Sequence, residues 1–117
     1  RVFLVITQYQ FQEEKMTNEN REPELQVISW YEKNDWKQLR SLLSDADLLP
    51  ESYDEWHSMA ESAIEQMQSQ NIIVVKVTID TVLFPAWCKK RGKAPDAEAR
   101  TLFAIETVQK QHFMNSL

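Results

Sequence analysis

Residues 71 to 80, N-I-I-V-V-K-V-T-I-D, form the densest β-branched run in the chain. Such side chains fit a pleated surface better than a helix, so the run predicts a strand. One face of this strand is wholly apolar, and the other is apolar at its start and polar at its end. The pattern favours a strand that is buried on one side and partly covered on the other; the apolar face comprises Ile73, Val75, Val77 and Ile79.

Two earlier segments also alternate between apolar and polar residues. Residues 2 to 12 and residues 24 to 32 predict strands, and a polar, aperiodic connector with Pro23 separates them. We therefore expect an antiparallel hairpin with a long tip. The strand at 72 to 79 would join residues 24 to 32 in parallel, because two helices lie between these strands in the sequence.

The helices are predicted from end signals and periodicity. Asn34 is a plausible N-cap for a short helix with an apolar stripe, and Ser52-Tyr-Asp-Glu55 is a capping box that opens a longer helix. A third helix is expected to begin near Phe84 and to end before Gly92, and a fourth to begin near Pro95. The expected fold is a single α+β domain over residues 1–117, with a three-stranded mixed sheet and about four helices.

Composition limits the possible functions. The net charge of −5 argues against broad binding to nucleic acids or anionic membranes, and no apolar run approaches the roughly 20 residues of a membrane span. No signal-peptide pattern is present, and a single cysteine excludes an internal disulfide, which fits the cytoplasm. The single glycine excludes glycine-rich phosphate loops and dinucleotide fingerprints. We therefore expect no such cofactor.

Catalytic and metal constellations are also missing from the sequence. His57 and His112 have no local relation to Cys88, and their spacing gives no metal-binding pair. Cys88 could be a reactive thiolate beside basic residues, but a cysteine near a helix C-terminus is more often a small buried hydrophobe. These absences favour a non-catalytic protein without a bound metal.

Two groups of residues remain as candidate sites. A small-molecule or enzyme pocket could form where aromatic residues and arginines converge, with Trp30, Trp36, Trp87, Arg91 and Arg100 as its candidates. A basic run could instead bind an anion, although such a run also complements a helix C-terminus; its candidates are Lys89, Lys90 and Lys93 beside Arg91. Arg100 could also pair with Asp96, one turn earlier on the same helix.

Residues 74 to 103 resemble a pattern found in small uncharacterised bacterial proteins. The pattern is a strand ending near an acidic residue, then A-W-C-x-x-R-G at 86–92, P-D-x-x-A-R at 95–100 and an aromatic residue, here Phe103. The resemblance implies no known activity. The leading hypothesis is thus a module that binds another protein or itself, through the hairpin or the last helix, with a homodimer as the commonest outcome.

Overall fold

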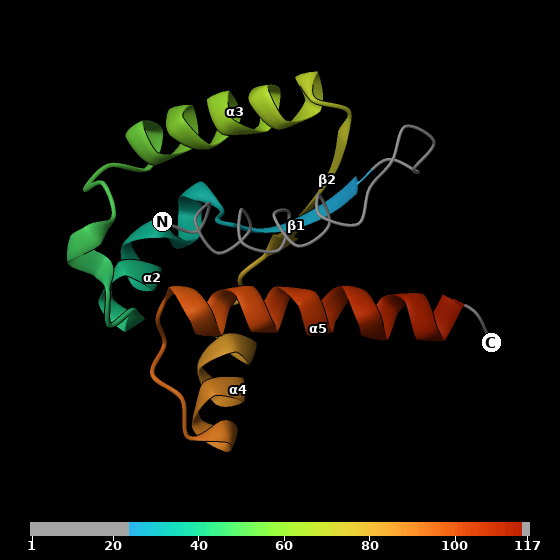
Figure 1. Cartoon of the computed structure of the whole chain (residues 1–117). Coiled ribbons are helices and arrows are strands. Elements are labelled where there is room, and N and C mark those ends of the chain that lie inside the picture. Colours follow the sequence, from blue (N-terminus) through green and yellow to red (C-terminus); the bar gives the residue numbers. More distant parts are fainter. Residues whose placement is uncertain (1–23, 116–117) are drawn as a thin grey trace.

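A two-stranded parallel sheet lies between helices in the computed structural model, which describes residues 24–115. Figure 1 shows α3 on one side of the strands and α5 on the other. Contacts of α3 with β2, and of α5 with both strands, agree with this layering. In chain order the elements are β1 (Glu24–Trp30), η1 (Lys33–Asp35), α2 (Trp36–Leu42), η2 (Ala46–Leu48), α3 (Tyr53–Ser69), β2 (Ile72–Thr78), α4 (Leu83–Arg91) and α5 (Ala97–Asn115).

The sheet corrects the predicted topology. β1 and β2 pair in parallel from Glu24↔Ile72 to Trp30↔Thr78, as the helical crossover between them predicted. The three-stranded mixed sheet is wrong, because the described sheet contains only these two strands. The predicted strand at residues 2 to 12 lies outside the described residues. Period-two alternation indicates which side chains can share a face of a strand. It does not indicate which strand that strand pairs with, so the alternation alone is not evidence for a hairpin.

Burial of β2 depends on position along the strand as well as on its face. Ile73 at its start is 52% exposed, Val77 near its end is buried, and Ile79 just beyond is fully buried. The buried residues of α5 all lie in its first half, between Ala99 and Ala104. On this face the cover is therefore most complete at the carboxyl end of β2, and the expected uniform apolar face is buried only there. The opposite face shows the reverse, because Ile72 at its start is buried and Thr78 at its end is exposed.

The capping signals explain where the helices begin and end. The Ser52 hydroxyl accepts a hydrogen bond from the Glu55 amide at 3.1 Å, which is one of the two bonds of the predicted capping box. Asn34 does not cap α2; it lies within η1, and Asp35 occupies the N-cap position without a side-chain cap bond. Gly92 follows α4 with φ +64°, the left-handed conformation that glycine adopts at little cost.

α4 begins at Leu83, which places Pro85 in its first turn, as predicted. One Asp80 carboxylate oxygen accepts hydrogen bonds from the Val82 and Leu83 amides, both at 2.7 Å. These bonds, the one from Leu83 first, lower the pKa of Asp80. The turn after β2 thus directs α4 against α5.

Candidate functional site

Trp30 and Trp36 belong to the hydrophobic core. Both are buried, and both rings lie next to Trp56 of α3, with ring-centroid distances of 5.0 Å for Trp30 and 5.6 Å for Trp36. The Trp36 indole also donates a hydrogen bond to the Glu51 carbonyl oxygen at 2.9 Å. Neither indole is therefore available to line an open pocket.

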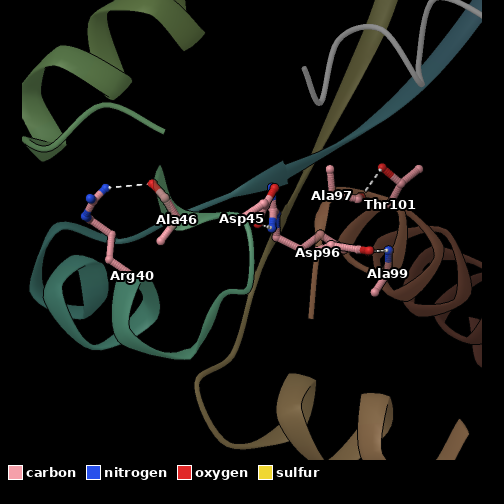
Figure 2. A network of polar contacts seen from close by, with 8 residues as sticks. Arg40, Asp45, Ala46, Asp96, Ala97, Ala99 and Thr101 are labelled. Carbon is pink, nitrogen blue, oxygen red and sulfur yellow. Dashed lines mark hydrogen bonds and ion pairs between the residues drawn. The ribbon is translucent and has the colours of Figure 1, made fainter. Parts of the chain in front are cut away.

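Arg100 forms a buried ion pair with a residue that is distant in sequence. Its side chain is 0% exposed, and its two terminal nitrogens donate to the two Asp45 carboxylate oxygens at 2.8 and 3.0 Å. Figure 2 shows Asp45, on the loop before η2, directed at the start of α5. The predicted pairing with Asp96 is wrong, because the Asp96 carboxylate caps α5 by accepting a bond from the Ala99 amide at 3.0 Å.

Further hydrogen bonds hold the same loop in place. The Ser44 amide donates to the Pro95 carbonyl oxygen at 3.0 Å. Arg40 of α2 donates to the carbonyl oxygens of Ala46 and Pro50, at 3.1 and 2.9 Å (Figure 2 shows the first bond). The Asp45–Arg100 pair thus belongs to a structural network that fixes the loop between α2 and α3 against α5.

Tyr31 is buried beside this pair. The Arg100 guanidinium carbon lies 5.9 Å from the centre of the Tyr31 ring. Burial raises the pKa of Tyr31 to about 12, and the positive charge of Arg100 offsets part of that rise. Burial, the largest single influence, would lower the pKa of Arg100, but the hydrogen bonds it donates to Asp45 and the charges of Tyr31 and Asp45 together raise it. Within residues 24–115, the Tyr31 hydroxyl and the Arg100 Nε have no hydrogen-bond partner.

The raised pKa of Tyr31 predicts a loss of stability at alkaline pH. In the unfolded chain the phenol ionises near its ordinary value of 10.0, whereas in the folded chain it ionises near 12. Its contribution is fully present below pH 10 and is lost as the pH rises to about 12, by up to about 2–3 kcal/mol. Urea unfolding from pH 8 to 11.5 should show wild type losing stability faster than Tyr31→Phe. Parallel pH curves for the two proteins would contradict this prediction.

Trp87 and Arg91 are in direct contact where α4 packs on α5. The Arg91 guanidinium carbon is 4.4 Å from the centre of the Trp87 ring, a cation–π geometry. Both side chains also donate to Oε1 of Glu106 on α5, Arg91 at 2.8 Å and Trp87 at 3.3 Å. The five predicted residues therefore fall into three places, namely the aromatic core, the buried ion pair and the α4–α5 surface. They do not form one pocket.

A groove begins at Arg91 and follows the second half of α5. We call it the α5 groove; its volume is about 550 Å³, and it is lined by Arg91, Glu106, Gln109, Lys110, Phe113 and Met114. Phe113 is 63% exposed and Met114 is 65% exposed, although both are large and apolar. The sequence reasoning found Arg91 alone among these residues. The missed signal was an adjacent apolar pair, Phe113 and Met114, after the polar run Gln109 to His112.

The three candidate lysines of the basic run do not line this groove. Lys89, Lys90 and Lys93 are exposed near the end of α4, and no ion pair or side-chain hydrogen bond joins them to another described residue. Their positions complement the negative end of the helix dipole. Cys88 is buried in the core cluster, and burial raises the pKa of its thiol. The alternative of a thiolate activated by its basic neighbours therefore has no support.

Metal sites and membrane helices are missing from the part of the chain that the structure describes. Among residues 24–115, no cluster of three or more His, Cys, Asp or Glu side chains could hold a metal ion. No helix in the same range is long and apolar enough to cross a membrane. No family model matches the chain, and no curated protein or solved structure is significantly similar to it.

Proposed function

We propose that this chain is a non-catalytic module that associates with itself to form a homodimer. The observation that carries the proposal is the α5 groove, with Phe113 and Met114 exposed beside it. Apolar side chains gathered around a hollow mark interaction sites more often than single exposed apolar residues do. Of the exposed large hydrophobic side chains in the described residues, Phe113 and Met114 are the two that line this groove.

The last helix has more support as the interface than the expected hairpin edge. The expectation of a dimer rested partly on an open hairpin edge, and the hairpin is not part of the described sheet. The other expected interface, the last helix, is supported because its second half leaves the core: every residue from Gln109 to Asn115 is exposed. A helix of 19 residues with an uncovered second half can offer that half to a partner.

The alternative of a small-molecule pocket has weaker support. Its expected aromatic wall is part of the core. Its two arginines form ion pairs in different places, Arg91 with Glu106 of α5 and Arg100 with Asp45 of the α2–α3 loop. An open groove on one helix encloses a small ligand poorly, whereas it can receive a helix of a partner. A cytoplasmic location, expected from the single cysteine, belongs to the same proposal.

Sedimentation velocity tests the proposed self-association. We expect the weight-average sedimentation coefficient to rise with concentration and to fit a monomer–dimer equilibrium with a Kd on the order of 1–100 µM, the range for a small interface. A sedimentation coefficient that stays at the monomer value up to the highest soluble concentration would contradict the homodimer.

A further inference from the structure

The α5 groove contains both members of a charge pair. Glu106 and Lys110 lie one helical turn apart, a spacing at which glutamate and lysine often pair within one helix. Here they do not: the ion pair of Glu106 is with Arg91 at 2.8 Å, and Lys110 has no ion pair within the described residues. Arg91 and Trp87 both donate to Oε1 of Glu106, so Oε2 has no hydrogen-bond partner in residues 24–115.

This arrangement is self-complementary. In a two-fold symmetric contact, residue i of one copy meets residue j of the other, and residue j of the first meets residue i of the second. If two α5 helices pack antiparallel across their grooves, the free Lys110 ammonium of each copy faces the open Oε2 of Glu106 in the other. Two ion pairs then form from groups that lack full partners in the single chain.

The apolar residues fit the same orientation. Phe113 and Met114 lie one turn or slightly more beyond Lys110, towards the end of the helix, whereas Arg91 bounds the groove at the Glu106 end. Antiparallel packing therefore carries Phe113 of each copy towards the hollow beside Arg91 of the other. Methionine adapts well to such irregular contacts because its side chain is unbranched and polarisable.

We infer that the partner of the α5 groove is a second copy of this chain, packed antiparallel with Glu106 and Lys110 paired reciprocally. This inference rests on the proposed function and adds the surface and the orientation. A second copy fits better than an unrelated helix because the α5 groove alone supplies Glu106, Lys110, the apolar side chains and the hollow that receives them.

The test uses charge reversal in the full chain, followed by sedimentation velocity. Lys110→Glu should raise the dimer Kd at least about tenfold, because two attractive pairs become two repulsive ones. Phe113→Ser should have an effect of similar size through lost apolar contact. Lys90→Glu and Met59→Ser are the matched controls, since both residues are exposed and neither lines the groove; they should leave the Kd within about twofold.

Mixing two variants tests the orientation itself. Lys110→Glu and Glu106→Lys should each dimerise poorly alone, and an equimolar mixture should form a heterodimer in which opposite charges meet again. Far-UV circular dichroism confirms that each variant is folded, which matters for Glu106→Lys because it removes the partner of Arg91.

The possible results separate the two claims. A wild-type chain that stays monomeric overturns both the proposed function and this inference. A wild-type dimer whose Kd is unchanged by Lys110→Glu and Phe113→Ser overturns the inference alone, and self-association then uses another surface. Variants that weaken the dimer without recovery in the mixture overturn the antiparallel pairing.

Discussion

Replacing Asp45 with alanine is expected to lower the free energy of unfolding by about 3–5 kcal/mol, the usual cost of removing one partner of a buried ion pair. The large value follows from the position of Arg100, whose side chain is 0% exposed. Two hydrogen bonds from its terminal nitrogens, at 2.8 and 3.0 Å, join its guanidinium to Asp45, and its Nε has no hydrogen-bond partner among the described residues. Without Asp45 the positive charge stays buried and uncompensated.

Urea unfolding at pH 7, followed by tryptophan fluorescence, measures this loss. The double variant Asp45→Leu with Arg100→Met is the informative control, because an apolar pair of similar volume removes both charges together. We expect it to be more stable than Asp45→Ala, since replacing a buried ion pair by packed apolar side chains is often neutral or stabilising. A loss below about 1 kcal/mol for Asp45→Ala would show that Arg100 finds water or another acceptor, contrary to the buried geometry.

Three features that depend on neighbouring residues were predicted correctly. The Ser52 cap, the left-handed Gly92 and the start of α4 with Pro85 in its first turn each follow from the chemistry of a few adjacent residues. The parallel pairing of β1 with β2 was also accessible, because a crossover of two helices leaves little alternative. The three-stranded mixed sheet was wrong, because the described sheet contains only β1 and β2. Residues 2 to 12 lie outside the described residues, and their alternation carried no information on pairing.

The candidate site was predicted poorly because it depends on contacts between distant residues. Asp45 and Arg100 are 55 positions apart, and sequence spacing instead favoured Asp96, whose carboxylate is used as a cap. Trp87 and Arg91 were identified, but Glu106, which brings them together, was not. A glutamate on a long amphipathic helix gives no sign of its partner until the packing of α4 against α5 is known.

The core aromatics were misjudged for a related reason. Trp30 ends β1 and Trp36 begins α2 just after it, near the carboxyl end of the strand, where parallel folds often bind ligands. In this chain α3 brings Trp56 to the same place, and the resulting cluster fills the space with side chains from the chain itself. The helical spacing of Trp56, Ala60 and Ile64 indicates a shared buried face on α3, but it gives no information on what Trp56 packs against.

Trp56→Ala is expected to cost about 3–5 kcal/mol of unfolding free energy, as for other large-to-small changes of core aromatics. The Trp56 ring lies 4.7 Å from Tyr31, 5.0 Å from Trp30 and 5.6 Å from Trp36, measured between ring centroids. Trp30 ends β1, Tyr31 follows it, and Trp36 belongs to α2. Losing the Trp56 ring would therefore weaken the packing of α3 against both β1 and α2. Thermal and urea unfolding measure the change.

Two variants on the same helix calibrate that result. Trp56→Phe keeps an aromatic ring and should recover more than half of the loss, because most of the apolar contact remains. Met59→Ala removes a side chain that is 55% exposed and should change stability by less than about 0.5 kcal/mol. A Trp56→Ala protein as stable as Met59→Ala would show that the aromatic cluster is not what holds α3 to the sheet. The cover on that face would then rest on the contacts of Ala60 and Ile64, the other buried residues of α3.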